Sequence, residues 1–300
     1  MLGPTASGKS EIAMALARRS GAAVVSVDSM QVYREMDIGT AKPTARERAE
    51  VPHFMIDLVT PETAFSVAEF QCEGVAVVDA QIEAGRRVII VGGSGLHFRA
   101  LVDPLEFPPT DHSVRQELEG AEPEALLAEL LDADPDAGQV VALDNPRRVL
   151  RAVEILRLTG ETATARASGP RAAAVRAYQS RLDVIAIGMD SGPELAGRIG
   201  RRFDGMLDRG LVAEVSHLAD RLGPTARYAV GYKELLAHLR EEISLRDARD
   251  AAIAATAALA KRQRTFFRRD PRIRWLPWHD DPAARTAAAA DALGGGLWNL

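Results

Sequence analysis

The sequence contains a single cysteine, Cys72, in 300 residues. One cysteine cannot form a disulfide within the chain, and it excludes a zinc site built from several cysteines. We expect Cys72 to be a small buried hydrophobic residue. No run of about 18 apolar residues occurs, so we expect no membrane-spanning helix. A glycine-rich segment begins at residue 3, so we expect no signal peptide. These absences favour a reducing compartment, and we expect a cytoplasmic protein.

Positive charge is also in short supply, because the net charge is −5. This value argues mildly against nucleic-acid binding, although a phosphate backbone responds to local patches. The last third of the chain holds such a patch, in which aromatic residues are interleaved with Lys261, Arg262, Arg264, Arg268, Arg269, Arg272 and Arg274. The aromatic residues are Phe266, Phe267, Trp275 and Trp278. This pattern is typical of phosphate binding and base stacking, but a solvated helix face followed by a core strand explains it equally well.

A phosphate-binding loop opens the chain. Its residues are Gly3, Pro4, Thr5, Ala6, Ser7, Gly8, Lys9 and Ser10, and they match Gly-x-x-x-x-Gly-Lys-Ser/Thr. Glycines let the backbone N–H groups converge on phosphate oxygens, Lys9 adds a charge, and the Ser10 hydroxyl can hold Mg²⁺. The helix expected over 11–19 directs its positive end at the same anion. The loop therefore predicts binding of a diphosphate or triphosphate group.

The strand that normally precedes such a loop is nearly missing, since only Met1 and Leu2 come before Gly3. Either this strand is very short or the start of the chain is misassigned. We expect a shortened strand to leave the edge of its neighbour exposed.

The hydrophobic pattern of the first hundred residues predicts a parallel α/β sheet. The expected elements are a strand over 22–27, a helix over 65–83 and a buried strand over 87–91. Ligands bind beyond the carboxyl ends of such strands. This rule places the phosphate-binding loop, Asp28 and the turn 92–95 on one rim.

A helical insertion is predicted in the middle of the chain. The pattern changes at a proline-rich linker, 104–109, and later returns to a strand and helices. We predict a catalytic core formed by 1–110 and 179–300, with a helical insertion over 111–178. Within the insertion we expect helices over 113–159 and an arginine-rich loop over 162–177. In the core that follows we expect a strand over 183–188, helices over 194–222 and from 231, and a short helix with a frayed end over 283–300.

Asp28 lies at a strand end beside the phosphate-binding loop. There it can hold Mg²⁺ through water, accept a proton, or cap the next turn. The strand over 87–91 ends in glycines, so it carries no Walker-B aspartate, and no Asn-Lys-x-Asp guanine-binding motif occurs. The absence of both motifs disfavours GTPases and motors and leaves transferases and small-molecule kinases.

Arg198 and Arg202 lie four residues apart on an expected helix, so they share one face and suit an anionic leaving group. Arg147, Arg148 and Arg151 form a similar cluster, although such clusters are solvated charges more often than ligands. We expect His97 to be a polar residue at a helix start, since no second histidine stands at ligand spacing.

Several segments, in this order and spacing, resemble the bacterial tRNA dimethylallyltransferase (tRNA isopentenyltransferase) family. They are GPTASGKS (3–10), SVDSMQ (26–31), Tyr33 with MDIGTAKP (36–43), PH (52–53), GGSGL (92–96), RRVLRAVE (147–154), 198–206 with 210–215, GYKE (231–234) and AKRQ (260–263). The resemblance spans nearly the whole chain. It implies a P-loop NTPase-like parallel sheet flanked by helices, with an inserted small helical domain.

The resemblance implies transfer of a dimethylallyl group from dimethylallyl diphosphate to N6 of adenosine 37 in tRNA, with release of diphosphate and with Mg²⁺ as cofactor. It assigns catalytic roles to Asp28, Thr5 and Arg202, with Asp28 as general base. Arg198 and the phosphate-binding loop would hold the diphosphate, and Ser10 would hold the metal.

The tRNA anticodon stem-loop is the partner that the resemblance implies, and the helical insertion would contact it. The implied tRNA-binding residues are Asp28, Ser29, Met30, Gln31, Ser94, Arg115, Arg147, Arg148, Val149, Leu150 and Arg151. Ser94 and His97 stand where the family often has threonine and tyrosine. The sequence leaves the oligomeric state open, and a monomer is compatible with it.

Two other enzymes remain alternatives. A free-nucleotide (adenylate) isopentenyltransferase would share the donor but accept AMP or ADP, and it is expected to lack the insertion and the basic tail. A P-loop small-molecule kinase would bind ATP and carry an arginine-bearing lid. A noncatalytic nucleotide-gated RNA-binding module is disfavoured because Asp28 stands where a base is useful.

Overall fold

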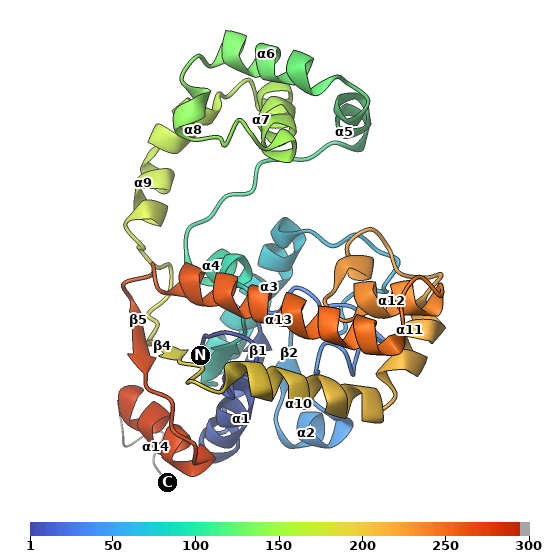
Figure 1. Ribbon diagram of the computed structural model, residues 1–300. Helices are drawn as coiled ribbons and strands as arrows, with labels where there is room; N and C mark the ends of the chain where they lie inside the picture. Colours follow the sequence, from blue (N-terminus) through green and yellow to red (C-terminus); the bar gives the residue numbers. More distant parts are fainter. Residues whose placement is uncertain (295–300) are drawn as a thin grey trace. The chain divides into compact units, whose positions relative to one another are not determined.

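The computed structural model describes residues 1–294, which divide into two compact units (Figure 1). The first unit combines Met1–Val102 with the chain from Asp183 onward, and the second is Asp103–Leu182. The insertion expected over 111–178 lies within the range of the second unit. The candidate site lies in the first unit, and each unit is described by itself.

A parallel sheet forms the centre of the first unit. Its strands are β1 (Ala23–Ser26), β2 (His53–Phe54) and β3 (Val88–Val91), in the order β2-β1-β3. Short apolar, β-branched runs favour buried parallel strands of this kind. A second parallel pair consists of β4 (Ala186–Met189) and β5 (Ile273–Leu276). The prediction of a parallel sheet flanked by helices is confirmed.

Leu2 connects the two groups of strands. It forms parallel bridges with Gly92 and with Gly188. Its N–H donates to the Ile187 carbonyl at 2.9 Å, and its carbonyl accepts from the Met189 N–H at 2.7 Å. One residue thus takes the place of a strand between β3 and β4. The expectation of an exposed edge is wrong at this position, because Leu2 pairs with Gly92 on one side and with Gly188 on the other.

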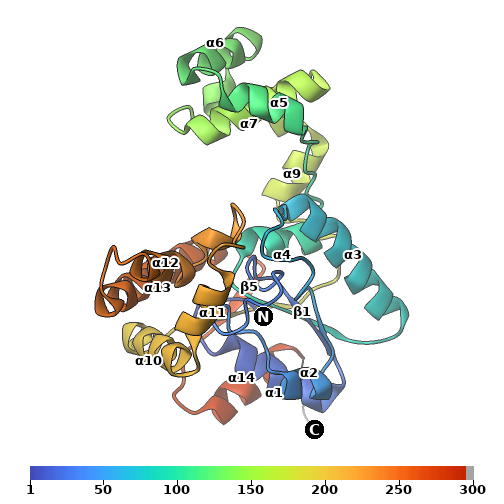
Figure 2. The same cartoon turned by 90° about the vertical axis from the view of Figure 1, so that its right-hand side faces the viewer.

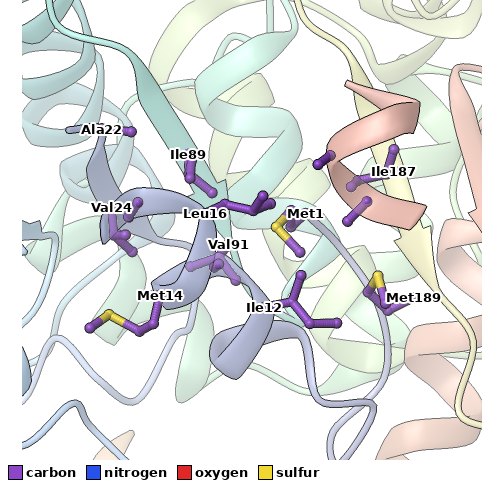
Figure 3. Close-up of a cluster of buried hydrophobic side chains, with 14 of the residues drawn as sticks. Met1, Ile12, Met14, Leu16, Ala22, Val24, Ile89, Val91, Ile187 and Met189 are labelled. Atoms are coloured by element: carbon purple, nitrogen blue, oxygen red, sulfur yellow. The ribbon is translucent and has the colours of Figure 1, made fainter. Parts of the chain in front are cut away.

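Helix α1 (Lys9–Ser20) packs on one side of the sheet, together with α14 (Pro282–Ala292). Ile12 and Leu16 of α1 are fully buried against Val91 and Ile187 of the strands (Figure 3). Complete burial of one such side chain contributes about 1.5–3 kcal/mol. This core fixes the start of α1, and with it the phosphate-binding loop, at the end of the sheet.

Helices α3 (Val67–Glu83) and α4 (Gly95–Val102) cover the other side (Figure 2). Helix α3 faces the protein interior through Phe70, Gly74 and Val78, which lie four residues apart. Cys72 lies two residues beyond Phe70, which turns it to the opposite face of the helix, and it is exposed. The expectation of a buried Cys72 is therefore wrong.

A layer of helices completes the first unit. Its members are α10 (Leu195–Asp208), α11 (Leu211–Leu218), the 3₁₀ turn η2 (Ala226–Tyr228), α12 (Tyr232–Leu239) and α13 (Leu245–Phe267). A short helix, α2 (Ala45–Glu50), precedes β2. Helix α13 contacts α4, α10 and α12, so its face can reach the rim of the sheet.

The second unit is helical. Its elements are α5 (His112–Glu119), α6 (Pro123–Ala133), η1 (Ala137–Gln139), α7 (Pro146–Thr159), α8 (Ala163–Ser168) and α9 (Pro170–Arg176). The loop expected over 162–177 is wrong, since α8 and α9 occupy it. Thr162 caps α8 with its side chain, and Pro170 starts α9, where its missing N–H costs nothing.

The expected helix in the C-terminal tail is present as α14. The expected frayed end falls partly on 295–300, which lie outside the described residues. Among the helices that the structure describes, none combines the length and the apolar character needed to cross a membrane.

Candidate active site

The phosphate-binding loop adopts a backbone that glycine makes accessible. Gly3 has φ of 151°, and a Cβ there would stand 2.7 Å from the Met189 carbonyl oxygen. Gly8 has φ of 78° and is the N-cap of α1, without a capping side chain. The first N–H groups of α1 therefore point into the loop, where an anion can accept their hydrogen bonds.

Lys9 extends across this loop, and its Nζ donates to the Pro4 carbonyl at 3.1 Å. The pKa of Lys9 is lowered to about 8, chiefly by burial and then by the charge of Arg202, while the charge of Asp28 opposes the shift. A lysine with a lowered pKa beside another cation gains stability when an anion binds.

A pocket of about 370 Å³ opens in front of the loop, and we call it the phosphate pocket. Apart from Glu11, its charged lining is cationic: Lys9, Arg198, Arg201, Arg202 and Arg285. Ser10 and Trp278 also line it. This excess of positive charge favours a polyanion over a neutral ligand.

A second pocket, of about 290 Å³, has a mixed lining. Asp28, Thr5 and Arg202 supply polar groups, and helix α10 supplies apolar side chains, including Ile199, Phe203 and Met206. Ser29 and Met30 also line it. Arg202 lines both pockets, so the two pockets share one guanidinium group.

Helix α10 positions Arg202 by its amphipathic pattern. Ile199, Phe203 and Met206 are buried at helical spacing, and Arg198 and Arg202 each precede a buried residue by one position. Arg202 is exposed to water in the open pocket. The surrounding protein nevertheless desolvates its guanidinium, and this desolvation lowers its pKa. The charge of Asp28 opposes this shift.

Asp28 lies two residues after the end of β1, and its side chain contacts the backbone of the turn that follows. Its Oδ1 accepts from the Met30 N–H at 2.9 Å, so the carboxylate also organises the turn. Thr5 is held from the side of α13, because its N–H and its hydroxyl donate to Oε1 of Gln263, at 2.8 and 3.3 Å. Sequence reasoning found the AKRQ segment but did not identify Gln263 as the partner of Thr5.

Ser94 lies at the start of α4, and its hydroxyl contacts Nδ1 of His97 at 2.7 Å. Its N–H donates to the Val27 carbonyl at 3.1 Å, which places it beside the end of β1. The His97 ring meets the Phe70 ring edge-on, with centroids 4.5 Å apart. Burial lowers the pKa of His97, and the charge of Asp28 opposes the shift.

The MDIGTAKP segment forms a loop that a single carboxylate organises. Glu214 of α11 accepts from the N–H groups of Asp37, Ile38 and Gly39, at 3.0, 2.7 and 3.0 Å. The Tyr232 hydroxyl donates to the same carboxylate at 2.5 Å. Sequence reasoning found the segment 210–215 but did not identify the role of Glu214, because no local pattern connects α11 to a loop far away in the chain.

Two further contacts stabilise this loop. Lys42 is buried and pairs with Asp37 at 2.9 Å and with Asp57 at 2.6 Å. Gln31 donates to the Thr40 carbonyl at 3.1 Å. Gln31, expected to contact tRNA, therefore also supports the wall of the second pocket, which Thr40 lines.

Trp278 and Arg285 extend the phosphate pocket from the C-terminal part of the first unit. Trp278, one of the aromatic residues interleaved with the basic tail, lines the phosphate pocket. Arg285 was missed, since a lone arginine in an alanine-rich helix gives no signal in the sequence.

The basic tail divides into two parts. Lys261, Arg262 and Arg264 lie on the exposed side of α13, whereas Phe267 is buried. Arg264 and Arg268 approach Asp190 at 3.4 and 3.5 Å. This arrangement matches the second of the two explanations, because an exposed basic helix face precedes the core strand β5, which contains Arg274 and Trp275.

The second unit carries the other expected tRNA contacts, and they differ in environment. Arg147 and Arg148 are exposed at the start of α7, Leu150 is half-buried, and Val149 packs in the core of the unit. Two further arginines pair with the fully buried Glu154: Arg115 at 3.1 Å and Arg151 at 2.9 Å.

The residues present fit a magnesium ion of the kind that accompanies diphosphates. In the chain as described, from residue 1 to 294, no group of three or more His, Cys, Asp or Glu side chains could hold a metal. Mg²⁺ needs no such cage, since it is commonly held by one or two protein oxygens, water and substrate phosphates. The exposed Ser10, at the start of α1, lines the phosphate pocket and offers one such oxygen.

Comparison with known proteins identifies the family. Residues 31–270 match the family model described as IPP transferase. A tRNA dimethylallyltransferase from Streptomyces avermitilis is 45% identical over 284 residues, which cover 92% of this chain and 88% of that protein. One from Corynebacterium glutamicum is 41% identical over 302 residues, covering 98% and 97%. Among solved structures, the tRNA isopentenylpyrophosphate transferase of Bacillus halodurans is 36% identical, with a TM-score of 0.71 and coverage of 99% of this chain and 95% of that one. The chain therefore belongs to the IPP transferase family.

Proposed function

We propose that the chain transfers a dimethylallyl group from dimethylallyl diphosphate to N6 of adenosine 37 in tRNA and releases diphosphate. The observation that carries this proposal is that Arg202 lines both pockets, so one guanidinium faces the phosphate-binding loop and also Asp28. The names of the matched relatives support the same reaction. We infer a cytoplasmic location because tRNA is the acceptor.

The phosphate pocket holds the diphosphate in this proposal. N–H groups of the loop, Lys9 and Arg198 bind its oxygens, and Arg202 stabilises the charge that develops on the leaving oxygen. Thr5 adds a hydroxyl group at the boundary with the second pocket. A Mg²⁺ ion held by Ser10 would neutralise part of the diphosphate charge.

The second pocket holds the reacting groups. Its apolar side chains from α10 suit the dimethylallyl group and one face of adenine. N6 attacks C1 as the C1–O bond breaks, and the electron pair of that bond leaves with the diphosphate. The N6 proton passes to the carboxylate of Asp28, which acts as general base.

The adenosine reaches this pocket only if it leaves the stack of the anticodon loop. We assign Ser29, Met30, Gln31 and Ser94 to contacts with the extruded base and its neighbours. In the second unit we assign tRNA contacts to Arg147 and Arg148, which are exposed, and to Leu150. Val149, Arg115 and Arg151 shape the same surface through the core and through Glu154.

A transfer assay tests the proposal. Purified protein, Mg²⁺ and labelled dimethylallyl diphosphate are mixed either with unmodified tRNA or with AMP. We expect label in tRNA and none in AMP. Label in AMP alone would replace the proposal with a free-nucleotide transferase, and ATP-dependent phosphorylation with no transfer would favour a kinase.

Asp28→Asn tests the mechanism within the same assay. Asparagine keeps an oxygen that can accept from the Met30 N–H, so the turn is retained while the base is lost. We expect kcat to fall about 10²- to 10⁴-fold, as is typical when a general base is removed. The dissociation constant for tRNA should stay within a factor of two or so, and an equal loss in both would make Asp28 a positioning residue.

A further inference from the structure

Arg285 is a buried cation whose hydrogen-bonding groups are only partly used. It lies one turn into α14 and is 6% exposed. Among the residues that the structure describes, its Nε and Nη1 have no hydrogen-bond partner. Within the described part of the chain, the only ion pair of Arg285 joins its Nη2 to Glu11 at 3.7 Å, and Glu11 is itself largely exposed. Leaving buried donors of a charged group unpaired is costly.

Two other cations of the first unit, one buried and one half-buried, have carboxylate partners at close range. Lys42 reaches the carboxylates of Asp37 and Asp57 and also the Tyr33 carbonyl. Arg272 forms a two-pronged pair with Asp270 through its Nε and Nη2, at 2.9 and 2.7 Å. A purely structural arginine at position 285 should show comparable partners, so its unpaired donors indicate a role in binding an anion.

The guanidinium of Arg285 faces the phosphate-binding loop. A Cβ added at Gly8 would collide with Nη1 of Arg285, so glycine allows the close approach. The same group stacks on the Trp278 ring, 4.3 Å from its centre, and Arg198 stacks on that ring at 3.8 Å. All three side chains line the phosphate pocket.

Trp278 is itself fixed in place. Its Nε1 donates to Asp280 at 2.8 Å, and Gly192 packs so closely that a Cβ there would stand 2.4 Å from the indole. The ring therefore orients two planar guanidinium groups beside the loop, at little further cost in side-chain entropy when an anion binds.

We propose that Arg285, oriented by Trp278, binds the diphosphate group of the donor and later of the product. The inference rests on the proposed function for the identity of the donor. The ligand that Arg285 binds is the diphosphate group, whichever donor carries it. The guanidinium of Arg285 donates to oxygens of the diphosphate in the phosphate pocket, which Arg202 also lines. Arg285 is then a binding residue of the donor site that α14 contributes.

Binding of inorganic diphosphate with Mg²⁺ tests this assignment, measured by calorimetry on the full chain without tRNA. The variant is Arg285→Met, which keeps the length of the side chain and removes the charge. We expect the dissociation constant to rise about 10- to 100-fold, since a hydrogen bond to a charged group contributes about 1.5–3 kcal/mol. Arg285→Lys should give an intermediate loss, because it keeps the charge and loses the fork.

Thermal unfolding without any anion separates binding from a structural role. Replacing an unpaired buried charge by an apolar side chain of similar length should leave Tm unchanged or raise it. Arg249→Met is the matched control, since Arg249 pairs with Asp204 and lines neither pocket. It should lower Tm slightly and leave diphosphate affinity unchanged.

Two outcomes would overturn the inference: Arg285→Met binds diphosphate as the unchanged chain does, or it unfolds for lack of the arginine. Failure of the proposed function has a different signature. If no label enters tRNA while diphosphate affinity still depends on Arg285, the reaction is wrong and the anion site stands.

Discussion

At the scale of single residues, burial sets the charge state of the phosphate-binding lysine. The Lys9 ammonium loses hydration in the loop and also feels the charge of Arg202, which lowers its pKa to about 8. The ammonium is therefore fully charged below pH 7 and loses its proton as the pH rises through 8 in the free protein. A bound anion reverses this effect, because it favours the charged form.

The affinity for dimethylallyl diphosphate should consequently fall as the pH rises from 7 to 9.5. Only the protonated form of Lys9 contributes its charge, so the dissociation constant should increase up to about tenfold per pH unit above 8. Calorimetric titration at half-unit intervals measures the slope.

Lys9→Arg is the control for this pH dependence, since arginine stays charged throughout the range. Ionisation of the ligand is common to both proteins, so the difference between the two slopes belongs to Lys9. Identical slopes would show that the lysine does not titrate near pH 8.

At the scale of elements, the loop 36–43 depends on the carboxylate of Glu214 in α11. Three consecutive N–H groups converge on it, and the buried Tyr232 hydroxyl joins them. Burial and the neighbouring carboxylate raise the pKa of Tyr232, so the phenol stays a donor at every working pH. The loop lines the second pocket through Gly39 and Thr40.

Glu214→Ala should lower the free energy of unfolding by about 3 kcal/mol, because three partly exposed N–H groups each lose a hydrogen bond that contributes about 1 kcal/mol. Tyr232→Phe removes one hydroxyl and keeps the three backbone bonds, so it should cost about 1 kcal/mol. Urea unfolding measures both values. Equal losses in the two variants would contradict a loop organised by Glu214.

Elements with strong periodicity were predictable, and short ones were not. The apolar spacing along α3 predicts that helix, whereas α8 and α9 are one to two turns long and rich in alanine and arginine. Thr162 caps the start of α8, and Pro170 occupies the first position of α9. A prediction based on composition gives little weight to such single residues. The expectation for Cys72 is wrong because its position on α3, opposite the buried face, determines its exposure more than its residue type does.

At the scale of the whole molecule, the second unit is assigned to tRNA through exposed charge. Arg147 and Arg148 are exposed at the start of α7. Replacing both by glutamine should weaken tRNA binding and reduce the slope of log K against log salt by about 1.4–1.8, if each arginine neutralises one phosphate. Filter binding between 50 and 200 mM salt measures this slope.

Arg157→Gln is the matched control within the same unit. Arg157 lies on the same helix, but Glu117 and Glu129 already engage it at 2.7 Å. Its replacement should leave the salt slope unchanged. A double variant with the slope of the unchanged chain would remove Arg147 and Arg148 from the tRNA surface.

The sequence predicted much of the molecule where the information is local or carried by motifs. The phosphate-binding loop, Asp28 beside it and the parallel sheet all follow from short segments. Glu214, Gln263 and Arg285 could not be found in this way, because each acts on a segment far away in the chain. The replacement of a strand by Leu2 depends on two partners, Gly92 and Gly188, that only the folded sheet brings together.

The position of Arg202 between the two pockets has a thermodynamic consequence. A guanidinium that faces both a donor anion and an acceptor nucleobase couples their binding equilibria. If the donor changes the affinity for the acceptor by some factor, the acceptor must change the affinity for the donor by the same factor. The affinity of one pocket therefore depends on whether the other pocket is occupied, and this dependence requires no domain movement.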